Sequence, residues 1–259
     1  MKIWIISDLH EDIIRTKEAI QILKDNECKK IICLWDFIGY SAPYYWYFAS
    51  RNWSAVIDEL KKNCDTVVVW NHDLFWIKKL PKYSSFKYPE NWLELDYQSQ
   101  EKLSNWILIF EENNELPSLI SHEEEKYISN LPEFVIEEID GIRILFSHRL
   151  YPDFSWSEMN FKIETLEYKQ HFEFMRENNC QFSFIGHAHK KQRLFTGNWI
   201  SYIEFGSKTI MPEGTWFVVP CVAKTTFENW VTIFDTETRE IEMIPLHSDI
   251  HIVPDRATK

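Results

Sequence analysis

The first seventy residues alternate between two hydrophobic periodicities, and this alternation restricts the chain to a small group of folds. Patterns typical of buried strands cover 2–7, 29–35 and 65–70, and helical spacing of apolar residues covers 16–26 and 52–63. Parallel strands need a long crossover between them, so this order predicts a parallel sheet with right-handed connections. We therefore expect an α/β fold.

Polar residues stand at the end of each of these three strands. Asp8 and His10 follow the first strand, Asp36 follows the second, and Asn71 and His72 follow the third. In open parallel sheets, ligands bind beyond the carboxyl ends of the strands. We therefore expect these five side chains to lie close together, although dozens of positions separate them along the chain.

The alternation stops after residue 76. Residues 77–140 are rich in Glu, Lys, Asn, Trp and Tyr, with helical stretches near 98–112 and 122–130. We interpret this segment as a helical cap inserted into a single domain that spans 1–259. An inserted cap leaves the strands before and after it free to join the same fold.

The strand pattern resumes near residue 141. One strand ends at His148, a helix is expected at 160–178, and a further strand ends at His187 and His189. From residue 193 onward, short strand-like segments alternate with turn signals. These segments predict a second, more antiparallel sheet.

Histidines are concentrated at the predicted strand ends. Five of the nine stand there beside acidic or amide residues: His10, His72, His148, His187 and His189. Carboxylate, amide oxygen and imidazole suit divalent Mn, Fe, Zn or Ni, and no cysteine stands among them to indicate a structural zinc site. The set is large enough for two ions about 4 Å apart that share a bridging carboxylate.

Five short motifs carry a resemblance to a known family. SDLH, WDFIG, WNHD, SH and GHAH resemble, in order and spacing, the motifs of the calcineurin-like metallophosphoesterases, from Asp8 to His189. The chain looks most like the small bacterial phosphodiesterase-type members. The resemblance implies a four-layer α/β/β/α sandwich of two mixed sheets.

The resemblance also implies a role for individual residues. The implied ligands are Asp8, His10 and His189 for a first ion, Asp36 as the bridge, and Asn71, His148 and His187 for a second ion. His72 would be the acid beside the phosphate or leaving group, with Asp73 orienting it. A metal-bridging hydroxide would attack phosphorus in line, and the ions, with manganese as the first choice, would neutralise the phosphoryl oxygens.

The chain departs from the family pattern at two kinds of position. Glu11-Asp12 stands where the family often has Gly-Asn, and Trp35 and Trp70 stand where glycines precede the bridging Asp and the Asn-His-Asp motif. Glycine is expected at these turns because the backbone bends sharply and approaches the ions closely. One explanation is that the tryptophans restrict substrate access or inactivate the site.

Composition offers a second explanation for these tryptophans. Trp outnumbers Gly by 12 to 6, and together they make 18 of 259 residues, about 7%, which is the usual share of glycine alone. Trp4, Trp199 and Trp216 also stand in segments where glycine would read naturally. The hypothesis is that many of these positions are UGA codons that the source organism translates as glycine.

Charge and cysteine content narrow the classes of partner. A formal net charge of -12 disfavours binding of nucleic acid through phosphate contacts, although metal ions can still attract a phosphate substrate. Five cysteines without a Cys-x-x-Cys pair indicate reduced thiols and a cytoplasmic protein. The apolar run before Asp8 is too short for a signal peptide or a membrane span, so we expect no membrane partner.

These observations predict a metal-dependent phosphoesterase that hydrolyses a small phosphomonoester or phosphodiester. The alternative is a catalytically weak or inactive binding scaffold with the same fold. Retention of His72 and of the seven ligand positions favours the enzyme, whereas Trp35 and Trp70 favour the scaffold. A nuclease is disfavoured by the acidic charge.

Two further features stay open at this point. Arg149 either contacts phosphate or forms a surface salt bridge. The second feature is an aromatic group that either stacks on substrate or packs between cap and core: Tyr40, Tyr44, Tyr45, Trp46 and Tyr47.

Overall fold

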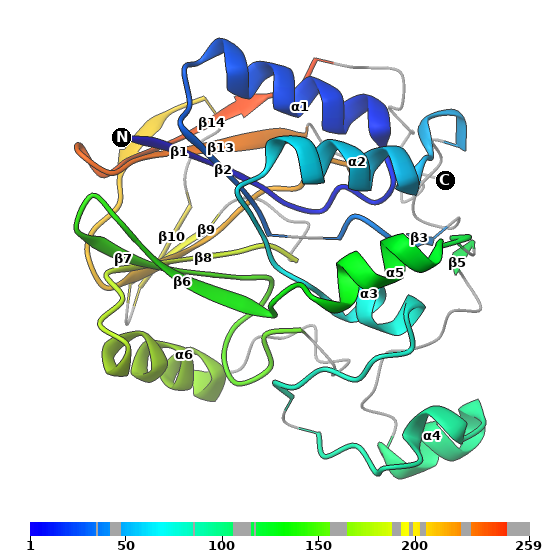
Figure 1. The fold of residues 1–259 in the computed structure, drawn as a ribbon. Coiled ribbons are helices and arrows are strands. Elements are labelled where there is room, and N and C mark those ends of the chain that lie inside the picture. Colours follow the sequence, from blue (N-terminus) through cyan, green and yellow to red (C-terminus); the bar gives the residue numbers. More distant parts are fainter. Residues whose placement is uncertain are drawn as a thin grey trace, which may run out of the picture.

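Two six-stranded sheets lie face to face, with helices on the outer face of each (Figure 1). The layer order is α/β/β/α, as the resemblance implied. The computed structural model describes residues 1–34, 36–41, 48–84, 86–105, 115–116, 118–155, 165–187, 193–196, 199–202, 206–223 and 229–247.

The first sheet is built on the alternating pattern of the first seventy residues. β1 (Lys2–Ile6) pairs in parallel with β2 (Lys30–Cys33), which pairs in parallel with β4 (Thr66–Val67). Three antiparallel strands complete the order β11-β14-β13-β1-β2-β4, namely β11 (Lys208–Ile210), β13 (Trp230–Asp235) and β14 (Glu240–Pro245). The sheet is therefore mixed, and β1 is one of its interior strands.

The second sheet is also mixed and has the order β10-β9-β12-β8-β7-β6. β7 (Ile142–Ser147), β8 (Phe182–Ile185) and β12 (Thr215–Val218) run parallel to one another. The antiparallel strands are β6 (Phe134–Ile139), β9 (Arg193–Thr196) and β10 (Trp199–Tyr202).

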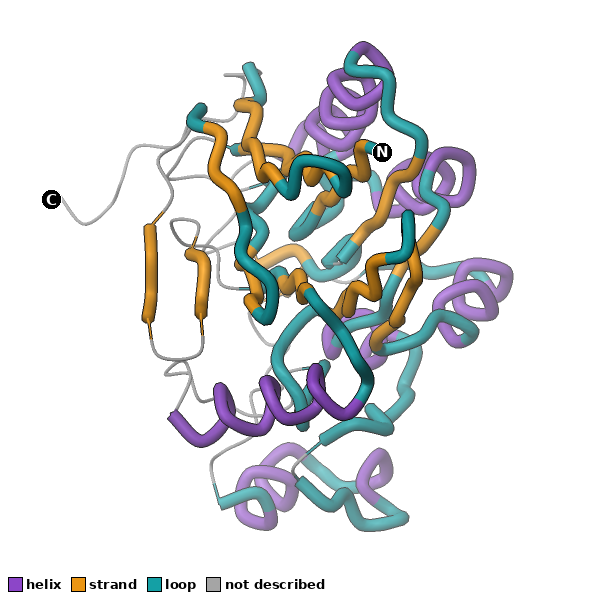
Figure 2. The backbone as a smooth tube through the Cα atoms, turned by 90° about the vertical axis from the view of Figure 1, so that its left-hand side faces the viewer, coloured by secondary structure: helices purple, strands orange, loops and turns teal. Residues whose placement is uncertain are grey.

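Apolar side chains join the four layers. Figures 1 and 2 show α1 (Ile13–Asp25) and α2 (Trp53–Asn63) over the first sheet and α6 (Thr165–Glu177) over the second. Between the sheets, the Phe234 ring lies 5.1 Å from that of Phe182 and 5.3 Å from that of Phe184, centroid to centroid. Burial of such apolar surface is the main force that holds layered folds together.

The first helices begin at capping side chains close to the strand ends. Asp12 accepts hydrogen bonds of 3.1 Å from the N–H groups of Ile14 and Arg15 at the start of α1. Asn52 accepts one of 3.0 Å from Ala55 N–H at the start of α2. These caps satisfy N–H groups that the helices themselves leave without partners. The Asp12 cap also fixes the end of the loop that follows β1.

The third strand is shorter than predicted. The sequence pattern predicted a strand over 65–70, but β4 ends at Val67. Val68 N–H still donates to the Cys33 carbonyl over 3.1 Å, whereas Val69 N–H donates to the carbonyl of Pro132 over 2.6 Å. The chain thus leaves the sheet because a neighbouring loop provides the next hydrogen-bond acceptor.

The segment 77–140 is only partly helical. Its described helices are η2 (Trp92–Glu94), α4 (Tyr97–Leu103) and α5 (His122–Ser129), and 106–114 lie outside the described residues. The prediction of a helical cap is wrong for Phe134–Ile139, which form β6. Asp140 and Gly141, with φ of 51° and 76°, make the tight turn that pairs β6 with β7. Whether the remainder is an inserted unit stays a prediction.

The strands after residue 193 do not form a sheet of their own, contrary to the prediction. β9, β10 and β12 complete the second sheet, and β11, β13 and β14 complete the first. β13 pairs antiparallel with β1, which would otherwise be an exposed edge of the sheet. Covering such an edge explains why the later strands are divided between both sheets.

The remaining elements are short. β3 (Tyr40–Ser41) pairs with β5 (Glu115–Leu116), and η1 (Phe48–Ser50) precedes α2. Of the helices that the structure describes, none is both long and apolar enough to span a membrane. All five cysteines lie in the described part of the chain, and no disulfide joins them.

Candidate metal centre

Backbone hydrogen bonds tie the loop after β1 to the loop after β2. The N–H groups of Leu9 and His10 both donate to the carbonyl oxygen of Asp36, over 2.8 and 2.6 Å. Glu11 N–H donates to the carbonyl of Phe37 over 3.0 Å. Because the two loops follow neighbouring parallel strands, these bonds fix how far apart their side chains stand.

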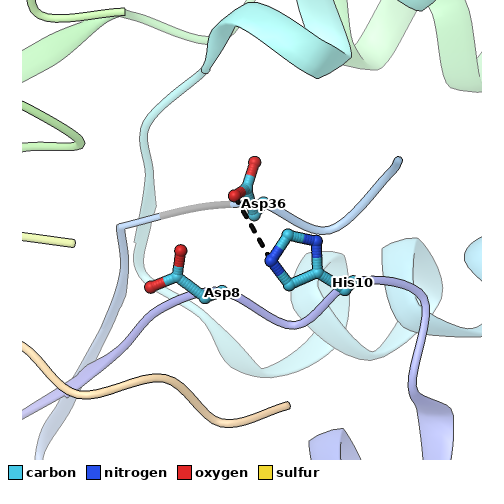
Figure 3. Close-up of side chains that lie close together, drawn as sticks. All are labelled: Asp8, His10 and Asp36. Carbon is cyan, nitrogen blue, oxygen red and sulfur yellow. Dashed lines mark ion pairs between the residues drawn. The ribbon is translucent and has the colours of Figure 1, made fainter. Parts of the chain in front are cut away.

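The side chains of Asp8, His10 and Asp36 meet between these loops (Figure 3). One potential ligand atom of each lies within 4.8 Å of the others, and all three residues are buried. Two carboxylates buried this close together repel each other unless positive charge lies nearby. A divalent cation supplies that charge, and carboxylate and imidazole suit Mn, Fe or Zn.

The His10 ring is oriented by a backbone carbonyl. Its Nδ1 lies 3.2 Å from the carbonyl oxygen of Gly39, which can only accept, so Nδ1 carries the hydrogen of this bond. In the neutral ring, Nε2 then faces Asp36 Oδ2 at 3.5 Å as a second acceptor. Two acceptors at this distance need a proton or a cation between them. The same orientation by a carbonyl is typical of metal-binding histidines.

Backbone strain is concentrated at the strand ends of the site. Asp8, His10, Glu11, Asp36 and His187 have φ of 56°, 41°, 64°, 62° and 68°, in the left-handed region that non-glycine residues seldom occupy. Strain of this kind persists where the surrounding structure enforces it, and it is frequent at functional sites. The φ of Glu11 also explains why glycine is frequent at this position in the motif.

The Glu11 carboxylate is buried and accepts three hydrogen bonds. Ser118 Oγ and Gly39 N–H donate to Oε1 over 2.5 and 3.2 Å, and Arg51 Nε donates to Oε2 over 2.5 Å. Burial raises the pKa of Glu11 above its ordinary value, although Ser118 and Arg51 act in the opposite direction. Arg51 also donates to the Leu116 carbonyl over 2.8 Å. Glu11 therefore connects the β1 loop to the start of α2 and to β5.

The second sheet brings two histidines to the same region. His148 follows β7, is fully buried, and has Nδ1 3.0 Å from the Leu34 carbonyl oxygen. Its ring centroid lies 5.2 Å from that of His187, which follows β8. A Cβ added to Gly186 would stand 2.0 Å from Ser7 Oγ. This close approach brings the end of β8 against the end of β1.

The short helix α3 (Asn71–Trp76) carries His72 and Asp73. The Asp73 carboxylate is buried, and its Oδ1 accepts a hydrogen bond of 3.1 Å from Ile38 N–H in the loop after β2. His72 is half-buried and lies against Gly39, whose φ is 94°. A Cβ at Gly39 would stand 3.0 Å from His72 Nδ1. Glycine is therefore required here by both the backbone conformation and the available space.

Trp70 is the residue that precedes α3. Its φ of -124° and ψ of 177° describe extended backbone that any residue adopts, so a sharp turn does not explain a glycine here. The indole is buried, with ring centroids 4.5, 4.2 and 5.3 Å from those of His72, His148 and His187. The close approach of the three histidines, and not a turn of the backbone, is therefore what would favour glycine at this position.

Apart from Asp73, whose side chain accepts a hydrogen bond from Ile38 N–H, the predicted site residues in the described part of the chain fall into two groups. The first group is Asp8, His10 and Asp36; the second lies around Trp70 and comprises His72, His148 and His187. The Asn71 side chain, Trp35 and His189 lie outside what the structure describes. The assignment of each residue to an ion stays a prediction.

The two features left open have structural answers. Arg149 is buried and pairs with Asp153 at 3.8 Å, so a surface salt bridge is wrong. Tyr40 is buried, with its ring 5.4 Å from that of Phe48, which supports packing. The other members of the aromatic group, Tyr44–Tyr47, lie outside the described residues.

Two residues beside the site were not singled out from the sequence. Gly39 could have been found, because a glycine in WDFIG that follows the second strand indicates a close backbone approach. Arg51 had no local signal, because its partner Glu11 lies 40 positions away.

A family match covers most of the chain. The calcineurin-like phosphoesterase superfamily domain matches residues 1–239, which include all the predicted site residues. A search of curated proteins gives no match.

Two solved structures share the fold. A metallophosphoesterase from Sphaerobacter thermophilus has a TM-score of 0.64 and 16% identity, over 96% of this chain and 89% of its own. A hypothetical protein from Pyrococcus horikoshii OT3 has a TM-score of 0.58 and 14% identity, over 99% of this chain and 90% of its own. At these identities, the likeness shows the fold and the arrangement of its layers.

Proposed function

The chain belongs to the calcineurin-like phosphoesterase superfamily and is a hydrolase of phosphoester bonds, and we propose that it cleaves a small phosphate monoester or diester at a divalent metal site that includes Asp8, His10 and Asp36. The observation that carries this proposal is the buried cluster of these three side chains, with ligand atoms within 4.8 Å of one another.

The cluster fits a divalent ion on its own chemistry. Two buried carboxylates need positive charge, and the Nδ1 hydrogen bond of His10 to Gly39 leaves Nε2 as the acceptor nitrogen beside Asp36. When bound, the ion supplies positive charge to the phosphoryl oxygens and lowers the pKa of a coordinated water. Manganese is the metal that we propose, and iron, zinc and nickel suit the same ligands.

Proton transfer is assigned to His72. Its half-buried ring stands at the start of α3, next to Gly39, where it can protonate the leaving oxygen of a substrate bound at the cluster. Asp73 acts as a positioning residue. Its hydrogen bond to Ile38 N–H anchors the first turn of α3, which carries both residues, to the loop after β2.

The family resemblance implies a second ion. His189 would complete the first position, Asp36 would bridge, and the second ion would be held by Asn71, His148 and His187. The His148 and His187 rings, 5.2 Å apart, are close enough to share an ion. The indole of Trp70 lies among these rings, so the second position does not fit an ion as the first one does.

Charge and composition support the substrate class and the cellular location that we propose. A net charge of -12 favours a small ester over a nucleic acid. Binding of a nucleic-acid backbone requires an excess of Lys and Arg, which this chain lacks. The five cysteines favour the cytoplasm. We therefore propose a small phosphate ester as the substrate and the cytoplasm as the location.

Turnover of a substrate panel tests this function. Protein stripped with a chelator and reloaded with Mn²⁺ should hydrolyse at least one of mono- and bis-aryl phosphates, cyclic nucleotides and dinucleoside polyphosphates. Asp36→Asn, purified identically, should lose both this turnover and bound manganese. Asp140→Asn, which changes an exposed carboxylate, should keep both. Equal turnover by parent and Asp36→Asn would exclude the assigned site.

A binding scaffold is the second candidate, and Trp70 is the observation that favours it. An indole among three histidines takes up space that a two-ion centre needs. A scaffold would bind phosphate compounds in a manganese-dependent way without turnover on any member of the panel. Calorimetric titration of the same compounds distinguishes the two functions.

A further inference from the structure

Trp70 stands where three separate elements meet. It precedes α3, and its indole contacts His72 of that helix, His148 after β7 and His187 after β8. Its ring lies tilted by 42°, 36° and 55° against these three imidazoles. Only 2% of the residue is exposed, so the indole fills an enclosed space.

The same space is the one that an ion shared by His148 and His187 requires. A bound zinc ion, for example, lies about 2.0–2.1 Å from an imidazole nitrogen and needs further ligands around it. The His148 and His187 centroids are 5.2 Å apart, and the indole centroid lies 4.2 and 5.3 Å from them. The three rings thus form a compact triangle in which the indole packs against both imidazoles.

We infer that the Trp70 side chain takes the place of the second ion, so that this chain holds a single ion at the cluster of Asp8, His10 and Asp36. The inference rests on the proposed metal site but not on turnover. It assigns to Trp70 a specific effect, which is exclusion of a cation by an apolar ring.

The backbone of Trp70 shows that space, and not strain, is the obstacle. Its φ of -124° suits tryptophan and glycine alike. Replacement by glycine therefore relieves no backbone strain, and removal of a buried ring leaves a cavity that destabilises the metal-free protein. Binding of an ion in the vacated space adds stability only when metal is present.

Ion counting tests this inference. The parent, Trp70→Gly and Trp70→Phe proteins would be stripped with a chelator, dialysed against excess Mn²⁺, and measured for manganese per chain by elemental analysis. We expect one ion in the parent, two in Trp70→Gly, and one in Trp70→Phe, which keeps an aromatic ring. Electron paramagnetic resonance should show isolated Mn²⁺ in the parent and an exchange-coupled pair in Trp70→Gly.

A second readout is thermal unfolding with and without manganese. Trp70→Gly should melt below the parent in chelator, and Mn²⁺ should raise its melting temperature more than that of the parent. If Trp70→Gly does not fold, Trp70→Ala provides the same space with less backbone freedom. Circular dichroism establishes which variants are folded.

The gain of one ion on removal of the ring is the deciding result. Two ions in the parent would overturn the inference, and so would equal counts in the parent and a folded Trp70→Gly or Trp70→Ala protein. Failure of the proposed function gives a different result: manganese in the parent would not depend on Asp36, and no member of the substrate panel would be hydrolysed.

Discussion

The Nδ1 atom of His148 lies 3.0 Å from the carbonyl oxygen of Leu34. Because a carbonyl oxygen only accepts, the ring donates from Nδ1 and keeps Nε2 as its acceptor nitrogen. Leu34 belongs to the chain between β2 and Asp36, so this bond joins the second sheet to a loop that carries part of the cluster of Asp8, His10 and Asp36. The ring is thereby held in the form in which histidine binds divalent ions.

A second replacement should remove the additional manganese ion that we expect in Trp70→Gly. In the double variant Trp70→Gly, His148→Ala, we expect manganese per chain to return to the parent value, because an imidazole ligand is lost. The matched control is Trp70→Gly, His122→Ala, which removes an exposed histidine of α5 and should keep the gained ion. Elemental analysis after dialysis measures both. A double variant that kept the gained ion would remove His148 from the ligand set.

Glu11 should contribute to stability far more than an exposed glutamate in a similar pair. Glu11→Ala removes the partner of Arg51, whose side chain is 15% exposed, and we expect a loss of about 3 kcal/mol in the free energy of unfolding. Glu213→Ala breaks an exposed pair with Arg239 and should cost at most about 1 kcal/mol. Urea unfolding in chelator measures both without a contribution from metal. Equal losses would show that the Glu11 network is not a structural anchor.

His171 should make the protein less stable as the pH falls from 7 to 5. The ring is buried, accepts a hydrogen bond from Tyr151 N–H and contacts Ser183 Oγ, and burial lowers its pKa from 6.5 to about 3. Below pH 6.5 the unfolded chain binds a proton that the folded chain excludes. The free energy of unfolding therefore decreases by about 2 kcal/mol between pH 7 and pH 5 through this group.

His171→Gln removes the titrating group and should weaken this pH dependence by a similar amount. His122→Gln, at a side chain that is 90% exposed, should leave the dependence as it is in the parent. Denaturant unfolding in chelator at pH 7, 6 and 5 compares the three proteins. Parallel curves for the parent and His171→Gln would contradict the assignment.

The parallel parts of the fold were predictable because their signals are local. The alternating patterns of the first seventy residues predicted β1, β2 and their helices, and the polar residues at the strand ends predicted the cluster of Asp8, His10 and Asp36. In an open parallel sheet, knowing where a strand ends is enough to place the residue that follows it. This is why sequence spacing alone predicted that these distant residues lie close together.

The structural predictions failed where a hydrogen-bond or ion-pair partner lies far away in the sequence, and in one place where the sequence contains a turn signal. Asp140-Gly141 forms a hairpin turn between two apolar runs. This turn signal in the sequence predicts a hairpin, and therefore a strand at the position of β6. The end of β4 could not be predicted, because it depends on the acceptor that Pro132 provides to Val69. The buried pairing of Glu11 with Arg51 likewise depends on tertiary packing.

His72→Ala should retain bound metal and lose activity. Its ring is half-buried beside Gly39, outside the cluster of Asp8, His10 and Asp36, so removal should leave manganese at the parent value. General acid catalysis typically contributes about 10²–10⁴-fold, so kcat should decrease by that order, most for esters with poor leaving groups. Rates on a series of aryl phosphates of different leaving-group pKa measure this. An unchanged dependence on the leaving group would exclude His72 as the acid.

The codons of the tryptophans separate the two explanations of Trp70. If the source organism reads UGA as glycine, its own protein has no indole among His148 and His187, and the second ion has room. Under the misread-glycine hypothesis we expect UGA at Trp70, whereas Trp92, whose buried ring lies 5.4 Å from that of Phe86, should be encoded by UGG. The nucleotide sequence gives both codons. The intact mass of the protein from the source organism shows whether the UGA codon is translated as glycine or as tryptophan. A UGG triplet at Trp70 would make the indole a genuine part of the protein, and exclusion of the second ion would then be a property of the native chain.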